Sequence, residues 1–79
     1  MSPAGNVTEL KNNVLSFRQN LGLTQEKLGA QVGLTRQTII AIEKGRFTPS
    51  VATALTLAKA LNTTVDELFW LADPGENEK

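Results

Sequence analysis

Apolar residues recur three and four positions apart through most of residues 10 to 71, and short breaks interrupt them. This spacing is typical of one face of an α-helix, and almost no segment alternates as a β-strand would. Glycine, serine or threonine stands at most of the breaks, and these residue types end and begin helices. The pattern predicts an all-α domain of five short helices with brief connections.

The five expected helices each have a predicted start and a predicted apolar face. The N-caps of the second to fifth helices are expected at Thr24, Thr35, Ser50 and Thr64. Thr64 and Glu67 have the spacing of a capping box. The residues expected to face the core are, helix by helix, Leu10, Val14, Phe17 and Leu21; Leu28 and Val32; Ile39 and Ile42; Val51, Ala54, Leu55, Ala58 and Leu61; and Val65, Leu68 and Phe69.

The length of 79 residues is that of one small domain. We expect a disordered lead-in at 1–8, the helical domain at 9–72 and an acidic tail at 73–79. The chain has no Cys and no His, so it lacks a thiolate, the usual general base and the commonest metal ligand. It shows neither a signal peptide nor a membrane span. These features predict a cytoplasmic protein that is not an enzyme and uses no metal or cofactor.

The charges are balanced in number but not in position. The chain has 8 Lys and Arg and 8 Asp and Glu. Residues 11–46 contain 6 of the cations and 2 of the anions, whereas residues 64–79 contain 5 anions and 1 cation. The basic part favours a nucleic-acid partner, and ordinary solvated surface charge is the alternative.

Two of the expected helices, Gln25–Val32 and Arg36–Lys44, are separated by only Gly33, Leu34 and Thr35. A short turn that contains glycine between two helices is the helix-turn-helix arrangement. Gly29 lies within the first of these helices, where glycine costs roughly 1 kcal/mol relative to alanine. A close approach of the next helix would explain it, and a neutral surface glycine is the alternative.

The helix from Arg36 has two different faces. Ile39, Ile42 and Glu43 are expected to point inward, and the opposite face carries Gln37, Ile40, Ala41 and Lys44. Glutamine pairs with adenine in the major groove, and isoleucine or alanine contacts the thymine methyl group. Arg36 is placed to reach a guanine or a phosphate. We therefore predict that Arg36, Gln37, Ile40 and Ala41 contact bases; a place in the core is the alternative for Ile40.

Other side chains suit a phosphate backbone or a structural role. The residues predicted to bind phosphates are Gln25, Lys27, Thr35, Lys44, Arg46 and Thr48. Glu43 points toward the core, where an unpaired carboxylate is costly, and Arg18 lies on the inner side of the first helix. We predict an ion pair between Arg18 and Glu43. A catalytic role for Glu43 would need a second acid, a His or a Cys nearby, and the sequence offers none.

Several of these segments together resemble the phage-repressor/Cro-like helix-turn-helix transcription regulators, the Xre family. The segments are Leu21–Leu28, Gly33–Ile39, Ile42–Gly45 and Pro49-Ser50. The resemblance covers residues 10 to 71 and implies a lambda-repressor-like five-helix fold that binds operator DNA as a symmetric dimer, with the third helix in the major groove. It also implies that Gln25 contacts a phosphate and braces a base-contacting residue. Alanine is more usual in this family where Gly29 stands, which should loosen the helix slightly, and a small polar residue is common at Ile40.

The C-terminal Phe69, Trp70 and Leu71 cannot all face one small core from one helical turn. We predict that these three residues form a dimer contact through the fifth helix; a Trp70 folded over the first helix is the alternative. The predicted function is a DNA-binding transcriptional regulator, a repressor that binds an inverted repeat as a homodimer. The alternatives are an antitoxin-like module that binds a protein such as a toxin, and a controller of restriction–modification genes.

Overall fold

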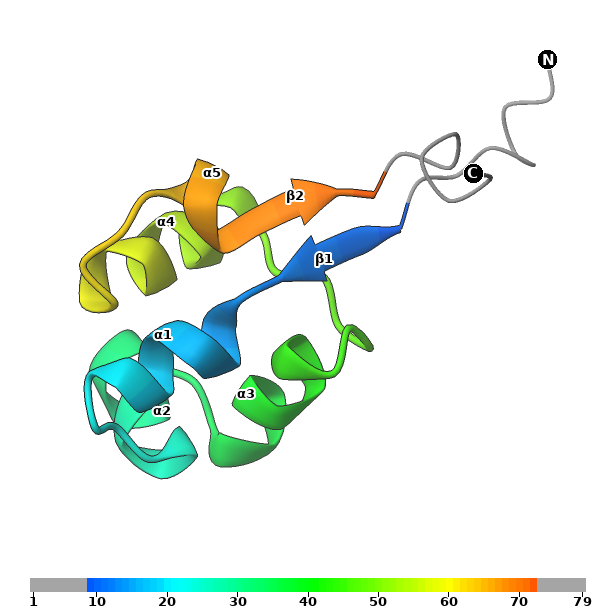
Figure 1. Cartoon of the computed structure of the whole chain (residues 1–79). Coiled ribbons are helices and arrows are strands. Elements are labelled where there is room, and N and C mark those ends of the chain that lie inside the picture. Colours follow the sequence, from blue (N-terminus) through cyan, green and yellow to red (C-terminus); the bar gives the residue numbers. More distant parts are fainter. Residues whose placement is uncertain (1–8, 73–79) are drawn as a thin grey trace, which may run out of the picture.

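The computed structural model describes residues 9–72, and in them the predicted five-helix fold is confirmed. The predicted lead-in 1–8 and tail 73–79 lie outside these residues. The helices are α1 (Val14–Asn20), α2 (Gln25–Val32), α3 (Arg36–Glu43), α4 (Val51–Ala60) and α5 (Val65–Leu68), and two short strands, β1 (Leu10–Asn12) and β2 (Phe69–Leu71), accompany them (Figure 1).

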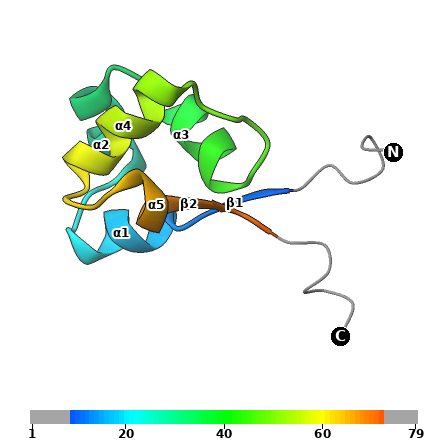
Figure 2. The same cartoon turned by 90° about the horizontal axis from the view of Figure 1, so that it is seen from above.

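The two strands correct the expected ends of the first and fifth helices. Leu10 belongs to β1 and not to a helix, and the chain leaves helical geometry at Phe69. The strands are antiparallel, with Lys11 opposite Trp70 and Asn12 opposite Phe69. Figures 1 and 2 show them side by side at one edge of the helical body. Each strand is too short to produce a visible alternation, and its partner lies at the other end of the described chain, so the apolar residues have the spacing of further helical turns in the sequence.

Threonine and serine begin four of the helices, as predicted. The hydroxyl oxygens of Thr24, Thr35, Ser50 and Thr64 each accept a hydrogen bond from the backbone N–H three residues later. The reciprocal half of the predicted capping box is wrong. The Glu67 carboxylate accepts a hydrogen bond from the Thr63 hydroxyl at 3.0 Å instead of returning to the N–H of Thr64.

The core lies where the five helices meet, with the start of β2 beside them. Its buried side chains are Val14, Leu28, Ile39, Ile42, Ala54, Leu57, Ala58, Leu61, Leu68 and Phe69. Three residues predicted to be inside are exposed: Leu21, Val51 and Leu55. α4 turns the face of Ala54, Leu57, Ala58 and Leu61 inward, so Val51 and Leu55, which lie four residues apart on the neighbouring face, point outward.

Gly29 lets the turn after α2 pack directly on the helix. Gly29 is buried, and its carbonyl oxygen accepts a hydrogen bond from the N–H of Leu34 at 2.8 Å. A Cβ atom added at Gly29 would lie 2.5 Å from the carbonyl oxygen of Leu34. Glycine therefore permits a close approach of the turn's own backbone to α2.

Candidate nucleic-acid interface

α2 and α3 pack against each other on either side of a tight turn, at the end of the molecule away from α5 and β2 (Figure 1). The turn begins at Gly33, which ends α2 in the left-handed conformation with φ 76°. A residue with a side chain adopts that conformation only at a cost, so glycine makes this sharp change of direction possible. Thr35 then caps α3 at once, which keeps the connection short. This geometry is that of a helix-turn-helix.

α3 has one buried face and one outward face. Ile39 and Ile42 are buried in the core. On the other side, Arg36, Gln37 and Lys44 are exposed, and Ile40 and Ala41 are half-buried. We call Gln37, Ile40, Ala41 and Lys44 the outer stripe. The sequence allows Ile40 to be either a base contact or a core residue. Its half-buried side chain is consistent with a partial role in both, since it is neither fully in the core nor fully exposed.

The surface around the outer stripe is predominantly basic. Lys27, Arg36, Lys44 and Arg46 are all exposed. Glu26 is the one exposed anion between residues 25 and 46, because the side chain of Glu43 is only 3% exposed. Thr48 is also exposed, in the loop between α3 and α4. Of the six predicted phosphate ligands, four therefore have exposed side chains free to meet a partner, namely Lys27, Lys44, Arg46 and Thr48.

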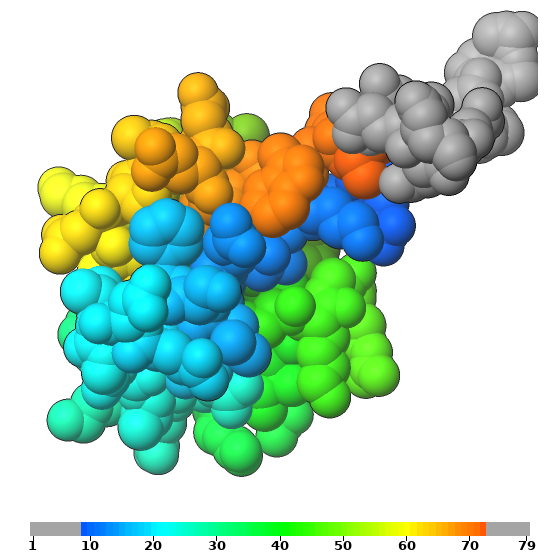
Figure 3. Space-filling view, viewed as in Figure 1, coloured from blue at the N-terminus to red at the C-terminus, as the bar shows by residue number. Residues whose placement is uncertain are grey.

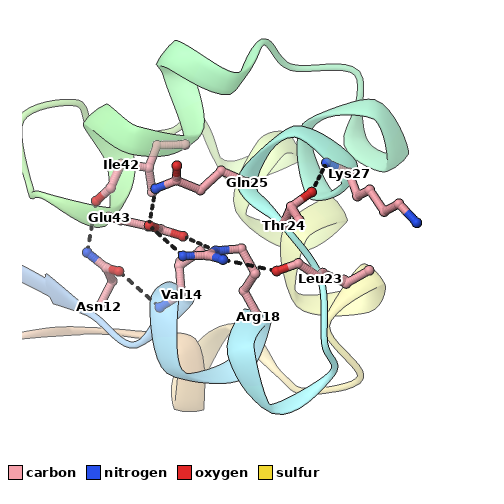
Figure 4. Close-up of polar contacts among 9 residues, drawn as sticks. All are labelled: Asn12, Val14, Arg18, Leu23, Thr24, Gln25, Lys27, Ile42 and Glu43. Atoms are coloured by element: carbon pink, nitrogen blue, oxygen red, sulfur yellow. Dashed lines mark hydrogen bonds and ion pairs between the residues drawn. The ribbon is translucent and has the colours of Figure 1, made fainter.

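The structure places Arg18 and Glu43 together, as the sequence predicts, and adds Gln25 to the pair (Figure 4). Arg18 Nε donates to Glu43 Oε2 at 2.6 Å, and Arg18 Nη2 donates to Oε1 at 3.3 Å. Arg18 Nη1 donates to the carbonyl oxygen of Leu23 at 3.0 Å. Gln25 Nε2 donates to Glu43 Oε1 at 3.0 Å. The network joins α1, the start of α2 and the end of α3.

Two predicted phosphate ligands already have partners within the chain. The amide of Gln25 is bonded to Glu43, and one of its two N–H hydrogens remains for another acceptor. The hydroxyl of Thr35 accepts from the N–H of Thr38 at 3.1 Å and lies 3.0 Å from the Thr38 hydroxyl. A phosphate contact from either residue remains a prediction. No sequence signal beyond its place at the start of α2 indicates that Gln25 joins the ion pair.

Sequence reasoning missed Asn12. Its Nδ2 donates to the carbonyl oxygen of Ile42 at 3.0 Å, and its Oδ1 accepts from the N–H of Val14 at 3.0 Å (Figure 4). It therefore supplies an acceptor to the first N–H of α1 and a donor to the end of α3 at the same time. The usual capping signal does not identify it, because Asn13, not Asn12, stands directly before α1 and makes no side-chain cap, and the spacing of Leu10 and Val14 placed Asn12 inside the expected first helix.

The three residues predicted as a dimer contact have different environments. Phe69 is buried in the core of its own chain. Trp70 is 43% exposed and Leu71 is 65% exposed, on the strand β2 and not on a helix. Figure 3 shows this strand, in orange, at the surface beside β1. Trp70 lies opposite Lys11 on β1. Val51 and Leu55 on α4 form a second exposed apolar pair, at 77% and 57%.

Residues 9–72 contain no group of three His, Cys, Asp or Glu side chains arranged to hold a metal ion. None of the helices in this range has the length and apolar character needed to cross a membrane.

Comparison with known proteins agrees with this geometry. The family model described as Helix-turn-helix matches residues 14–68. The HTH-type transcriptional regulator YgzD of Bacillus subtilis is 47% identical over 64 residues, which cover 81% of this chain and 97% of YgzD. The control protein C.SmaI of Serratia marcescens is 41% identical over 60 residues, which cover 76% of this chain and 71% of that protein.

Solved structures show the same fold. The restriction-modification controller protein C.AhdI from Aeromonas hydrophila superposes with a TM-score of 0.64 at 33% identity, over 68% of this chain and 78% of that chain. The hypothetical transcription factor NHTF from Neisseria superposes with a TM-score of 0.65 at 32% identity, over 82% and 72%. The chain belongs to the Xre-like helix-turn-helix family of transcriptional regulators.

Proposed function

We propose that this regulator binds a specific DNA operator as a homodimer, with α3 in the major groove, and acts in the cytoplasm as a repressor. The observation that carries the proposal is the outer stripe: α3 buries Ile39 and Ile42 and turns an exposed Gln37, with Ile40 and Ala41 beside it, away from the core. A helix with such a face and exposed cations at its ends has the composition of a major-groove ligand.

Each residue in the proposed contact has a distinct chemical role. Gln37 pairs with the N6 and N7 edge of an adenine, and Ile40 and Ala41 contact thymine methyl groups. Arg36, exposed at the first turn of α3, reaches guanine or the backbone. The proposed phosphate ligands position the protein without selecting sequence, and they are Gln25, Lys27, Thr35, Lys44, Arg46 and Thr48.

A dimer would read an inverted repeat. Two copies of α3 related by a twofold axis lie about 34 Å apart when they enter successive major grooves. The exposed Trp70 and Leu71 support a contact between copies through β2. Occupancy of a promoter by such a dimer blocks polymerase, and this step requires no catalysis.

A second candidate role is control of restriction–modification genes. It is favoured by the similarity to the control protein C.SmaI and to the controller protein C.AhdI. In this role the operator lies upstream of the regulator's own gene or of an adjacent restriction–modification gene. Binding of the protein to a duplex from one of these upstream regions would distinguish this role from regulation of unrelated genes. No feature of residues 9–72 favours the antitoxin alternative.

The test of sequence-specific binding is a selection from random duplex DNA, followed by measurement of Kd across salt concentration. We expect an enriched inverted repeat and a steep loss of affinity with salt, because several cations displace counterions from the phosphates. Binding without enrichment would contradict the proposal of a specific operator.

The proposed base contact is tested by Gln37→Ala on the selected DNA. We expect a loss of about 1–3 kcal/mol in binding and relaxed preference at one base pair of each half-site. Gln19→Ala is the matched control, because Gln19 is an exposed glutamine on α1 and belongs to neither helix of the α2–α3 unit. An unchanged sequence preference in Gln37→Ala would place base contact elsewhere.

The proposed dimer contact is tested by sedimentation of Trp70→Ala and Leu71→Ala over a range of protein concentrations. We expect both variants to dissociate at concentrations where the original chain is dimeric. Leu55→Ala serves as the comparison on α4. Dissociation of Leu55→Ala alone would move the contact from β2 to the exposed face of α4.

A further inference from the structure

Asn12 joins three elements through one side chain and one backbone pairing. Its side-chain amide bonds the N–H of Val14 in the first turn of α1 and the carbonyl oxygen of Ile42 in the last turn of α3, each at 3.0 Å. Its backbone lies opposite Phe69 in the β1–β2 sheet. Figure 4 shows the side chain between α1 and the end of α3.

We propose that Asn12 is a positioning residue for DNA binding, through which the β1–β2 sheet sets the orientation of α3. The inference rests on the proposed function, because it concerns the helix proposed to enter the major groove. It adds a residue that is not among the proposed DNA contacts and lies far from the outer stripe in sequence.

The first argument is the kind of atom that Asn12 binds. The last carbonyl groups of a helix have no partner within the helix. The Ile42 carbonyl oxygen accepts from the N–H of Gly45 at 3.0 Å, and Asn12 supplies a second donor. Asn12 thus holds the backbone of α3 itself, whereas contacts of apolar side chains allow some sliding.

The second argument is that two adjacent residues of α3 are held from different directions. Glu43 is bonded through its carboxylate to Arg18 and Gln25. Ile42 is bonded through its backbone to Asn12. Loss of the Asn12 attachment leaves the last turn of α3 held by Glu43 and by the buried Ile39 and Ile42, but no longer through its backbone, and binding must then restore the order that this turn lacks.

The third argument is that the sheet determines where Asn12 lies. Side chains of a strand alternate between its faces, so a register shift of one residue would turn Asn12 away from α3. The observed register sets Asn12 opposite Phe69, which is buried in the core. The Phe69 ring therefore fixes the register, and through Asn12 the register fixes α3.

Two variants separate the bonds of Asn12. Asn12→Asp keeps an oxygen that accepts from the N–H of Val14, but a carboxylate oxygen replaces the donor and repels the Ile42 carbonyl. Asn12→Ala removes both bonds. Asn13→Ala is the matched control, because Asn13 is the adjacent asparagine and its side chain makes no capping hydrogen bond.

The decisive measurement is Kd for the selected DNA at a temperature where urea denaturation shows every variant to be fully folded. We expect Asn12→Asp and Asn12→Ala to bind about fivefold more weakly than the original chain, and Asn13→Ala to bind equally. A residue that only stabilises the fold would not change Kd under these conditions. Equal Kd values for Asn12→Asp and Asn13→Ala would overturn the inference.

Amide hydrogen exchange gives a readout without DNA. The N–H groups of Lys44 and Arg46, bonded to the carbonyl oxygens of Ile40 and Ala41, report on the end of α3. We expect their exchange to be faster in Asn12→Asp and unchanged in Asn13→Ala. If no DNA is selected but exchange accelerates, the proposed function fails while the positioning of α3 by Asn12 stands. Unchanged exchange in Asn12→Asp overturns the positioning itself.

Discussion

The α2–α3 unit and the β1–β2 sheet have contrasting origins. In the α2–α3 unit, the caps and the turn join residues that are close in sequence, such as Thr35 with Thr38 and Gly29 with Leu34. In the sheet, Asn12 and Phe69 come from nearly opposite ends of the described chain. The difference shows that the proposed DNA-binding surface forms from local signals, whereas its attachment to the rest of the molecule depends on distant partners.

The largest expected effect tests this contrast by removing the ion pair between Arg18 and Glu43, which attaches the α2–α3 unit to α1. Glu43→Ala should lower the free energy of unfolding by about 3–5 kcal/mol, because it leaves the guanidinium of Arg18 buried without its partner. The side chains of Arg18 and Glu43 are only 10% and 3% exposed. Urea denaturation measures the loss. Glu26→Ala, at an exposed position, is the control and should change stability by less than about 0.5 kcal/mol. If Glu43→Ala and Glu26→Ala unfolded at the same urea concentration, the Arg18–Glu43 ion pair would contribute little to stability.

The next effect tests what holds the sheet. Phe69→Ala should cost about 3 kcal/mol, because it removes a buried aromatic ring and leaves a cavity. Leu71→Ala, on the same strand but largely exposed, should cost less than about 1 kcal/mol in the monomer. Thermal unfolding of both variants at low protein concentration compares them. Similar losses would mean that the strand is held by its backbone pairing and not by the Phe69 side chain.

A smaller effect tests whether the turn between α2 and α3 needs its close contact with Gly29. Gly29→Val should cost about 2 kcal/mol, because the side chain meets the Leu34 carbonyl and the turn must move. Ala30→Val is the control, since Ala30 is the exposed neighbour on α2. Urea denaturation gives the difference between them. If the two substitutions cost the same, the close approach at Gly29 would not be needed for the fold.

The smallest expected effect tests a single helix cap, that of Thr35 on α3. Thr35→Ala should cost about 1 kcal/mol, because the N–H of Thr38 loses its capping acceptor. Thr56→Ala is the comparison, since its hydroxyl bonds the Ala52 carbonyl within α4 and caps nothing. We expect Thr56→Ala to be neutral by thermal unfolding. An equal loss in both variants would point to a general effect of removing threonine.

The sequence predicted the features that depend on nearby residues. The caps at Thr24 and Thr35 and the turn at Gly33 each combine a residue type with a short spacing, so periodicity and capping rules were sufficient. The burial of Ile39 and Ile42 followed from the same periodicity. The proposed base contacts remain predictions, which rest on the residue types along the outer stripe.

The features that sequence reasoning missed depend on contacts between residues that are far apart in the sequence. Leu10 and Phe69 have helical spacing to their neighbours, but pairing across the chain made them strand residues. Leu57 is buried and Leu55 exposed because α4 is rotated slightly from the predicted orientation. A hydrophobic pattern predicts which face of a helix is buried only to within the rotation that separates neighbouring residues. Packing against the neighbouring helices determines the exact orientation.

The pairing of β1 with β2 also makes the described chain almost circular. The N–H of Ala72 donates to the carbonyl oxygen of Glu9 at 2.8 Å. A short linker between these two residues would therefore replace a contact that already exists, and new ends opened in the exposed loop at Arg46–Thr48 would interrupt no helix or strand. In such a circular permutant β1 and β2 would become a hairpin, so the entropy lost in closing the longest loop of the fold would fall, and the sheet would change from a late contact into an early one.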